Sequence, residues 1–407
     1  MAILVTNRVR AKTVSAGLKT IAIASAQNPM DMRTWSGIPA HLSLAFEDAG
    51  IKVIQGGPLE VKEPSYYRWL RSGYSRLGLG WFLADMEPRI LKQRAAALQN
   101  ILENSEAEAV VSIQPDPIAA IRPNVPTALV HDCTFALLVD YYRQFTGLTK
   151  RSVQLGHRAY RQALRGASVS IFASEWAARS AVRDYGADPA RVHVAEFGAN
   201  LRDPPSRQEV AGFVESRVSA GEYRFLFLGV EWIRKGGDDA VALVKTLRKM
   251  GIAAFLDIVG CSMQGHADSR QFCVEHGFLD KGNVQDRTRL KSLMESASFL
   301  VVPSLAECFG CVYCEANAYG IPCIGRDTGG VSQAIRPGVN GFLLSEDGRN
   351  LEEIAEQIRP FLASPDEYRK IAAKSRSEFE QRLNWNRFAE TTLRLLETAK
   401  AQVHPNN

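Results

Sequence analysis

The chain has 407 residues, of which 46% are hydrophobic and 23% charged, and its formal net charge is +5 at pH 7. This composition excludes a disordered chain, and the length predicts two domains of roughly 200 residues each. No apolar run approaches the roughly 18 to 20 residues of a membrane-spanning helix, and no secretory signal is convincing. The expected location is therefore the cytoplasm.

The basic residues are unevenly distributed. The first twenty residues contain four basic residues and no acidic one; this fits an organelle transit peptide but is more typical of a frayed terminus or an over-long start. Residues 141–165 contain six basic residues and no acidic one, and residues 66–94 interleave Trp69, Trp81 and Phe82 with arginines. Solvated helix faces are the simpler interpretation of both segments, and the alternative is a surface that contacts an anionic acceptor or the inner face of an anionic membrane. Nucleic acid is not an expected partner, because no nucleic-acid motif accompanies the charge.

Short β-branched runs alternate with longer amphipathic stretches in the first half of the chain. Such runs predict buried strands of a parallel sheet at 21–25, 51–54, 109–113, 127–131 and 168–174. The amphipathic stretch 37–50 between the first two runs predicts a helix that ends at Gly50.

The same alternation resumes after residues 200–210, whose adjacent prolines and low apolar content predict a linker. The strands predicted in this second half lie at 223–230, 253–261, 297–303, 321–325 and 340–344. A last helix is predicted over 383–402. Two successive doubly wound α/β domains account for the pattern, and a ligand is expected in the cleft between them, at the carboxyl ends of the strands.

Two predicted strand ends of the first domain carry candidate site residues. Gly37 opens a helix after the first strand, where a glycine lets a phosphate approach backbone N–H groups, although a tight turn explains it equally well. His131 and Asp132 end the fourth strand. A lone histidine is usually structural, but its place at the expected cleft makes a functional role as plausible.

In the second domain, Arg234 and Lys235 follow the first strand and precede two glycines. A guanidinium and an ammonium suit a diphosphate, and a solvated turn is the alternative.

The stretch ECFGCVYCEANAYGIPC, residues 307–323, contains the strongest candidates. Glu307 is predicted in a loop after a strand, and Glu315 about one and a half turns into the following helix. The free N–H groups at the start of that helix, near Gly310 and Cys311, form an anion site. The two carboxylates can accept hydrogen bonds from hydroxyls on either side of the anion, which is the layout of a sugar, a diphosphate and a ribose.

Cysteines in the same stretch also have the C-x2-C-x2-C spacing of an iron–sulfur site, at Cys308, Cys311 and Cys314. Ala318 stands where the ferredoxin pattern has its fourth cysteine, and Cys323 falls in the next predicted strand. Buried cysteines that pack as small apolar groups are therefore favoured over a cluster or a zinc site. The chain's seven cysteines are expected to be reduced thiols.

Together these segments resemble the retaining glycosyltransferases of family 4, which have the GT-B fold. The resemblance rests on the E-x7-E pair of Glu307 and Glu315, on DTGGVSQAIRPGVNGFLL at 327–344, on GVEWIRKGG at 229–237 and on EFGAN at 196–200.

The resemblance implies a division into an acceptor-binding domain at 1–203, a donor-binding domain at 204–385 and a helix at 386–407 that returns to the first domain. It implies that the ribose of a nucleotide-sugar donor binds Glu315. The transferred sugar and its diphosphate would bind Glu307 and the backbone of Phe309, Gly310 and Cys311.

The resemblance also assigns the cationic groups. Lys235 would neutralise the diphosphate as the leaving group gains charge. The family commonly has an arginine directly after the glycine that ends the strand, whereas Val230 follows Gly229 here. Arg234 supplies the missing charge if it points into the cleft.

The remaining expectations complete the site. Gly37, Gly229 and Gly330 are assigned to the donor, and His131 joins the catalytic candidates. No cofactor and no metal is expected, since relatives of this fold usually work without a metal. Retention is ascribed to attack on the face beside the leaving phosphate, so no protein nucleophile is expected.

The predicted activity is transfer of a sugar from a nucleoside diphosphate sugar to a glycan, a lipid-linked acceptor or a small molecule. The alternatives are a nucleotide-sugar binding protein that has lost turnover, motivated by Val230, and a nucleotide-sugar epimerase of the same fold. The choice of base and sugar is assigned to the loops 278–281 and 329–331.

Overall fold

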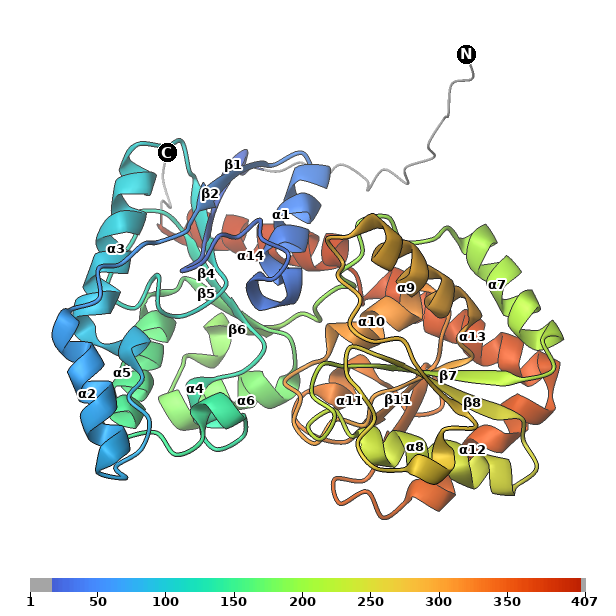
Figure 1. Ribbon diagram of the computed structural model, residues 1–407. Coiled ribbons are helices and arrows are strands. Elements are labelled where there is room, and N and C mark those ends of the chain that lie inside the picture. Colours follow the sequence, from blue (N-terminus) through green and yellow to red (C-terminus); the bar gives the residue numbers. More distant parts are fainter. Residues whose placement is uncertain (1–16, 404–407) are drawn as a thin grey trace.

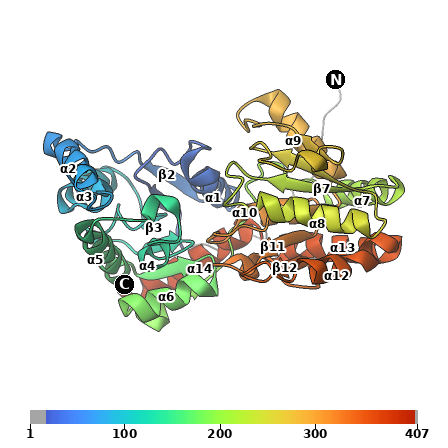
Figure 2. The ribbon, with the colours of Figure 1, turned by 60° about the horizontal axis from the view of Figure 1, so that its bottom comes forward.

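The structure, a computed structural model, describes residues 17–403, with side chains described as far as residue 401. It has two α/β domains side by side, each built on one six-stranded parallel sheet with helices on both faces (Figures 1 and 2). The predicted fold class is confirmed. None of the helices within the described residues is long and apolar enough to cross a membrane.

The first sheet has the strand order β2-β1-β3-β4-β5-β6. Its strands are β1 (Thr20–Ala24), β2 (Lys52–Gly56), β3 (Ala109–Ser112), β4 (Thr127–His131), β5 (Val169–Phe172) and β6 (Val192–Val194). The helices of this domain are α1 (Ile38–Asp48), α2 (Ser65–Arg76), α3 (Pro88–Glu103), α4 (Phe135–Leu138), α5 (Lys150–Gly166) and α6 (Glu175–Tyr185). Every residue of β1, β3, β4 and β5 is buried, which explains why these strands are continuous apolar runs in the sequence.

The second sheet has the order β12-β11-β10-β7-β8-β9. Its strands are β7 (Tyr223–Leu228), β8 (Ala254–Val259), β9 (Cys273–Glu275), β10 (Phe299–Val301), β11 (Cys323–Arg326) and β12 (Gly341–Leu344). Its helices are α7 (Arg207–Ser219), α8 (Gly237–Lys249), α9 (Val284–Ser296), α10 (Cys311–Ala318), α11 (Val331–Ala334), α12 (Leu351–Ala363) and α13 (Pro365–Gln381).

The predicted linker at 200–210 is too long by four residues. Helix α7 begins at Arg207, because Ser206 accepts a hydrogen bond from the N–H of Glu209 and the Glu209 carboxylate accepts one from the N–H of Ser206. This capping box fixes the start of the helix, and of the predicted linker only residues 200–206 are irregular.

The last helix, α14 (Trp385–Val403), packs against α1 and against β4 and β5 of the first sheet. Both ribbon views show it leaving the second domain and running along the first (Figures 1 and 2). The predicted return of the C-terminal helix is thus confirmed.

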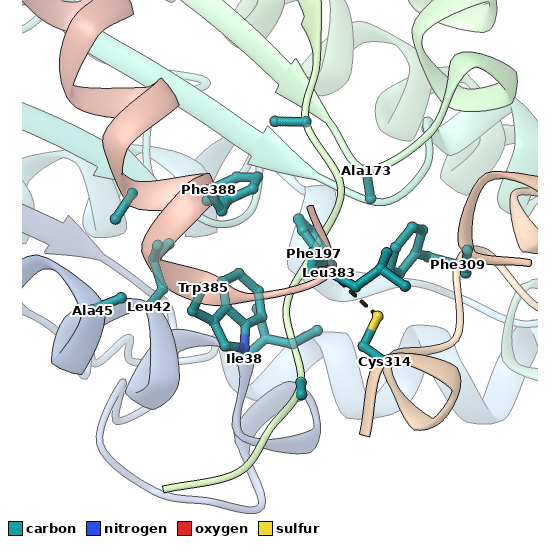
Figure 3. Close-up of a cluster of buried hydrophobic side chains, with 14 of the residues drawn as sticks. Ile38, Leu42, Ala45, Ala173, Phe197, Phe309, Cys314, Leu383, Trp385 and Phe388 are labelled. Atoms are coloured by element: carbon teal, nitrogen blue, oxygen red, sulfur yellow. Dashed lines mark hydrogen bonds between the residues drawn. The ribbon is translucent and has the colours of Figure 1, made fainter. Parts of the chain in front are cut away.

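A buried aromatic cluster joins the two domains at the start of α14 (Figure 3). Phe197 has its ring centroid 5.2 Å from that of Trp385, 5.5 Å from Phe388 and 5.7 Å from Phe309. Its carbonyl accepts a hydrogen bond from the Cys314 thiol. Burial of one such ring contributes about 1.5–3 kcal/mol, so this cluster stabilises the contact between the two domains.

Candidate active site

The centre of the site is the loop between β10 and α10, which contains Glu307. Gly310 ends this loop with a φ of +91° and caps α10. A Cβ at this position would collide with the ring of Tyr313, so only glycine allows the turn. The turn leaves the first N–H groups of α10 directed away from the helix, and this is the predicted anion site.

Glu307 is paired with two cations. Its Oε2 accepts a hydrogen bond from the Lys235 Nζ, and the Arg234 Nη1 lies 3.8 Å from the same oxygen. Lys235 stands on the loop after β7, where its methylenes cross Gly229; a Cβ at Gly229 would lie 2.7 Å from the Lys235 Cγ. Gly229 therefore makes room for the lysine, and a direct donor contact by Gly229 stays a prediction.

Arg234 points toward the cleft, which answers the question raised by Val230. Its Nη1 donates to the Ala306 carbonyl at 3.1 Å, and its guanidinium lies over the ring of Tyr142, 5.4 Å from the centroid. The Nε donates to Glu231 at 2.8 Å. The guanidinium is therefore held beside Glu307 from the same loop that lacks the expected arginine at position 230.

Glu315 is buried within α10 and is paired with Lys281, from the loop 278–281 to which the choice of base and sugar was assigned; the pairing itself was not predicted. Its two oxygens accept hydrogen bonds from the Lys281 Nζ at 3.0 and 3.2 Å. Lys281 lies in the loop after β9, and its side chain is 46% exposed whereas that of Glu315 is 8% exposed. A hydroxylated ligand that binds both oxygens of Glu315 therefore competes with a partly exposed cation.

Two tyrosines of the first domain reach across the cleft to the Glu307 loop. The Tyr141 hydroxyl accepts a hydrogen bond from the Glu307 N–H at 2.9 Å and lies 2.9 Å from the Thr328 Oγ1. The Tyr142 hydroxyl accepts from the Cys308 N–H at 3.1 Å. Burial raises the pKa of Tyr141 to about 12, so its hydroxyl keeps its proton at neutral pH.

Gly329 and Gly330 allow the two domains to come into contact beside the Glu307 loop. A Cβ at Gly329 would lie 2.7 Å from the Tyr141 hydroxyl, and a Cβ at Gly330 would lie 2.6 Å from the Ser174 Oγ and would collide with the Cys308 carbonyl. The structure thus places Gly330 in a contact between the domains. Its assignment to the donor finds no support in this packing and stays a prediction.

His131 and Gly37 come together on the first-domain side of the cleft. Trp35, Ser36 and Gly37 have φ values of +44°, +58° and +83°, and the Trp35 ring stacks on His131 with 5.1 Å between centroids. The His131 Nδ1 lies 2.5 Å from the Cys133 carbonyl oxygen and 3.3 Å from the Cys133 backbone nitrogen, so the backbone of Cys133 holds this ring nitrogen.

The strained turn at 35–37 is held by a hydrogen-bonded relay from the last helix. Asn200 donates from Nδ2 to the Ser36 carbonyl at 2.9 Å and accepts at Oδ1 from the Trp385 Nε1 at 2.9 Å. Consecutive non-glycine residues with positive φ persist only where their surroundings fix them, and this relay provides that support.

The cysteines behave as packing residues. Cys308 and Cys314 are buried, Cys311 is half-buried, and Cys323 lies buried in β11. Burial raises the pKa of the Cys311 and Cys323 thiols well above the usual value. Within residues 17–401, the one group of three ligand-type side chains that the structure gathers comprises the neighbours His131, Asp132 and Cys133, so the C-x2-C-x2-C spacing produces no cluster geometry.

Comparison with known sequences finds relatives of the second domain. The sequence model of the family described as Glycosyl transferases group 1 matches residues 213–378. The D-inositol 3-phosphate glycosyltransferase of Nocardia farcinica is 28% identical over 236 residues, which are 56% of this chain and 52% of the relative. The matched part of this chain thus spans about half the length of that relative.

Solved structures match over nearly the whole chain. Sucrose-phosphate synthase from Thermosynechococcus elongatus has a TM-score of 0.65 at 17% identity, with 94% of this chain and 100% of that chain covered. HepE of Anabaena, solved in complex with UDP and glucose, has a TM-score of 0.59 at 15% identity over 94% of this chain and 100% of its own. The chain therefore has the GT-B fold, and its second domain belongs to the group 1 glycosyltransferases.

Proposed function

We propose that the protein transfers a sugar, with retention, from a nucleoside diphosphate sugar to an acceptor held by the first domain. The observation that carries the proposal is the arrangement around the start of α10, where Glu307 with two cations lies on one side and buried Glu315 on the other. The HepE structure contains UDP and glucose, which is the class of ligand that this arrangement suits.

The proposed roles follow from charge and position. The ribose hydroxyls donate to Glu315, and the diphosphate accepts from the first N–H groups of α10 and from Lys235. The sugar hydroxyls contact Glu307 and the backbone from Phe309 to Cys311.

Bond breaking moves negative charge onto the departing diphosphate. Lys235 and Arg234 stand where that charge develops, so they stabilise the transition state more than the ground state. The acceptor hydroxyl attacks from the same face, and its proton passes to an oxygen of the leaving phosphate. We assign His131 a contact with a hydroxyl of the transferred sugar. No metal or cofactor enters this scheme, in line with the resemblance.

A binding protein without turnover is the second candidate, since Val230 replaces a common arginine. The direction of Arg234 weighs against it, because a guanidinium still lies beside Glu307. Product analysis without added acceptor separates both candidates from an epimerase, which would return an isomerised donor.

We also propose that the first domain contacts an anionic membrane. Trp69 and Trp81 are 77% and 69% exposed, and Leu77 and Leu79 lie exposed between them. Exposed tryptophans beside the arginines of α2 suit a lipid interface. Co-sedimentation with strongly anionic vesicles, containing roughly 30% phosphatidylserine, tests this proposal. Equal recovery of the protein with anionic and with uncharged vesicles would reject it. A cytoplasmic location remains a prediction.

The experiment that tests the function is a thermal-shift screen of UDP, GDP and ADP sugars with the wild-type chain and the variant Glu315→Ala. One donor class is expected to raise the unfolding midpoint of the wild type but not that of the variant. The variant is also expected to lose turnover of that donor. Unchanged donor affinity and turnover in Glu315→Ala would refute the assignment.

A further inference from the structure

A cavity of about 600 Å³ lies between the two domains beside the Glu307 loop. Its first-domain wall comes from the segment 136–141 and the start of α6, and its second-domain wall from residues 327–333 and Glu346. Figure 1 shows α4 and α6 facing α11 across this junction.

The position of the cavity relative to the site follows from the strand order. The loop after β9 carries Lys281, the loop after β10 carries Glu307, and β11 is the next strand on the side away from Lys281. The cavity lies at the carboxyl end of β11. It therefore extends from the sugar end of the proposed donor site, opposite the end that binds the nucleoside.

One wall separates the cavity from Glu307. Tyr141 lines the cavity, and its hydroxyl is hydrogen-bonded to the Glu307 N–H. The Tyr141 and Trp176 rings lie 5.6 Å apart at 46°, and Trp176 is half-buried. Their tilted rings offer an apolar platform with polar groups at its edge, a combination that suits the C–H face of a sugar ring.

Most of the charged groups around this platform are carboxylates, and most of these carboxylates have no partner among the described residues. The lining includes the carboxylates of Asp140, Glu175, Asp327 and Glu346 but only one cation, Arg179. Within the described part of the chain, the side chains of Glu175, Asp327 and Glu346 have no hydrogen-bond or ion-pair partner, whereas the carboxylates of the donor site are all paired. Carboxylates accept hydrogen bonds from hydroxyls, and a surplus of them repels phosphate.

We propose that this cavity is a subsite for a neutral sugar of a chain-like acceptor, beyond the sugar that reacts beside Glu307. The proposal rests on the proposed function and narrows it, because a cavity with this charge disfavours a phosphate group at that point of the acceptor. Trp176 and Tyr141 supply the platform, and Asp327 and Glu175 receive hydroxyl hydrogen bonds.

The test is saturation-transfer NMR with the full chain and two kinds of trisaccharide probe, neutral and anionic. The neutral probes are maltotriose, cellotriose and globotriose, and the anionic probe is 3′-sialyllactose. At least one neutral trisaccharide is expected to receive saturation, with at least tenfold weaker binding in Trp176→Ala. Glu352→Gln, an exposed carboxylate on α12, is the matched control and is expected to bind like the wild type.

A charge reversal keeps the test independent of folding defects. Asp327 is exposed, and Asp327→Arg is expected to weaken neutral binding and to admit 3′-sialyllactose. The proposal is overturned if no neutral trisaccharide binds, if only the anionic one binds the wild type, or if Trp176→Ala and Asp327→Arg bind as the wild type does. A thermal shift with the nucleotide sugar, recorded in parallel, reports the donor site separately, so failure of the subsite is distinguishable from failure of the proposed function.

Discussion

Single residues of the site are held by partners that a donor would have to replace. Glu315 and Lys281 form the clearest case, because the lysine occupies the carboxylate that the ribose is proposed to bind. The pairing joins a loop residue and a helix residue that are 34 positions apart in the chain. It was not predictable from sequence, because spacing places Glu315 on its helix but does not say which loop covers it.

The first prediction concerns Lys281→Met. Removal of the lysine leaves the buried Glu315 unpaired, so the donor-free protein should lose about 1 kcal/mol of unfolding free energy, a value kept low because Lys281 is half-exposed. The donor no longer competes with a cation and should bind about fivefold more tightly.

Calorimetric titration with the donor and thermal unfolding without it measure the two effects. Lys374→Met, an exposed lysine on α13, serves as the control. Weaker donor binding in Lys281→Met would show that the lysine helps to bind the donor rather than competing with it for Glu315.

The second prediction concerns Tyr142→Phe. The substitution keeps the ring beneath Arg234 but removes the hydroxyl that accepts from the Cys308 N–H. Loss of this hydrogen bond should cost about 1 kcal/mol or somewhat more, because the group is partly buried. The Glu307 loop should become less well positioned, and kcat should fall about fivefold with little change in donor affinity.

Steady-state kinetics separate kcat from KM in this variant. Tyr74→Phe removes a hydroxyl on α2, far from the loop, and should leave both constants unchanged. A rise in KM alone would place Tyr142 in donor binding instead.

Whole elements were predicted well where burial dictates their sequence. The strands β1, β3, β4, β7, β8 and β11 all follow from largely apolar runs, since a strand covered on both faces is mostly apolar. The edge strands β6 and β9 were missed, because each has only three residues and at least two of them are partly or fully exposed. Helix α10 and the loop before it were predicted correctly, since glycine and the helical spacing of Glu315 are local signals.

The contacts between elements were beyond sequence reasoning. Tyr141 and Tyr142 lie in a basic segment that pattern alone assigns to a solvated face, yet they meet a loop that is 166 residues away. The relay from Trp385 through Asn200 to Ser36 likewise joins three distant segments. Such pairings arise from how the two sheets dock, which local periodicity does not encode.

The third prediction tests this relay with Asn200→Ala. Loss of the amide leaves the Trp385 N–H and the Ser36 carbonyl without their partner, which should cost roughly 2–4 kcal/mol for two buried groups. The strained turn at 35–37 should relax, so Trp35 should leave its stack on His131.

Denaturant unfolding measures the stability loss, and near-ultraviolet circular dichroism reports the tryptophan environments. Asn100→Ala on the exposed face of α3 is the control. An unchanged tryptophan spectrum together with full stability would mean that the turn is held by other contacts.

At the scale of the whole molecule, buried histidines make stability depend on pH. His41 is buried in α1, with its Nδ1 2.8 Å from the Gly37 carbonyl, and burial lowers its pKa. Burial also lowers the pKa of His157 and of His193. In the unfolded chain, histidine takes up a proton at about pH 6.5, before the folded form does.

The fourth prediction follows from the sign of that difference. Below about pH 6.5 the unfolded state binds more protons than the folded state, so stability is complete above this pH and falls as the pH decreases. The unfolding midpoint should drop between pH 7 and pH 5, and His41→Gln should show a shallower drop. Equal slopes for the variant and the wild type would exclude His41 as a source of the dependence.

The two domains face each other in a closed arrangement, with donor-site pairs on one side of the Glu307 loop and the acidic cavity on the other. The proposed function makes one central claim, which is that the cleft transfers the sugar of a nucleotide sugar with retention. Time-resolved proton NMR of donor consumption tests it most directly. The account predicts that the wild type converts one α-configured nucleotide sugar to an α-configured product, and that Glu315→Ala does not. Formation of a β-configured product, or no consumption of any UDP, GDP or ADP sugar, would contradict it.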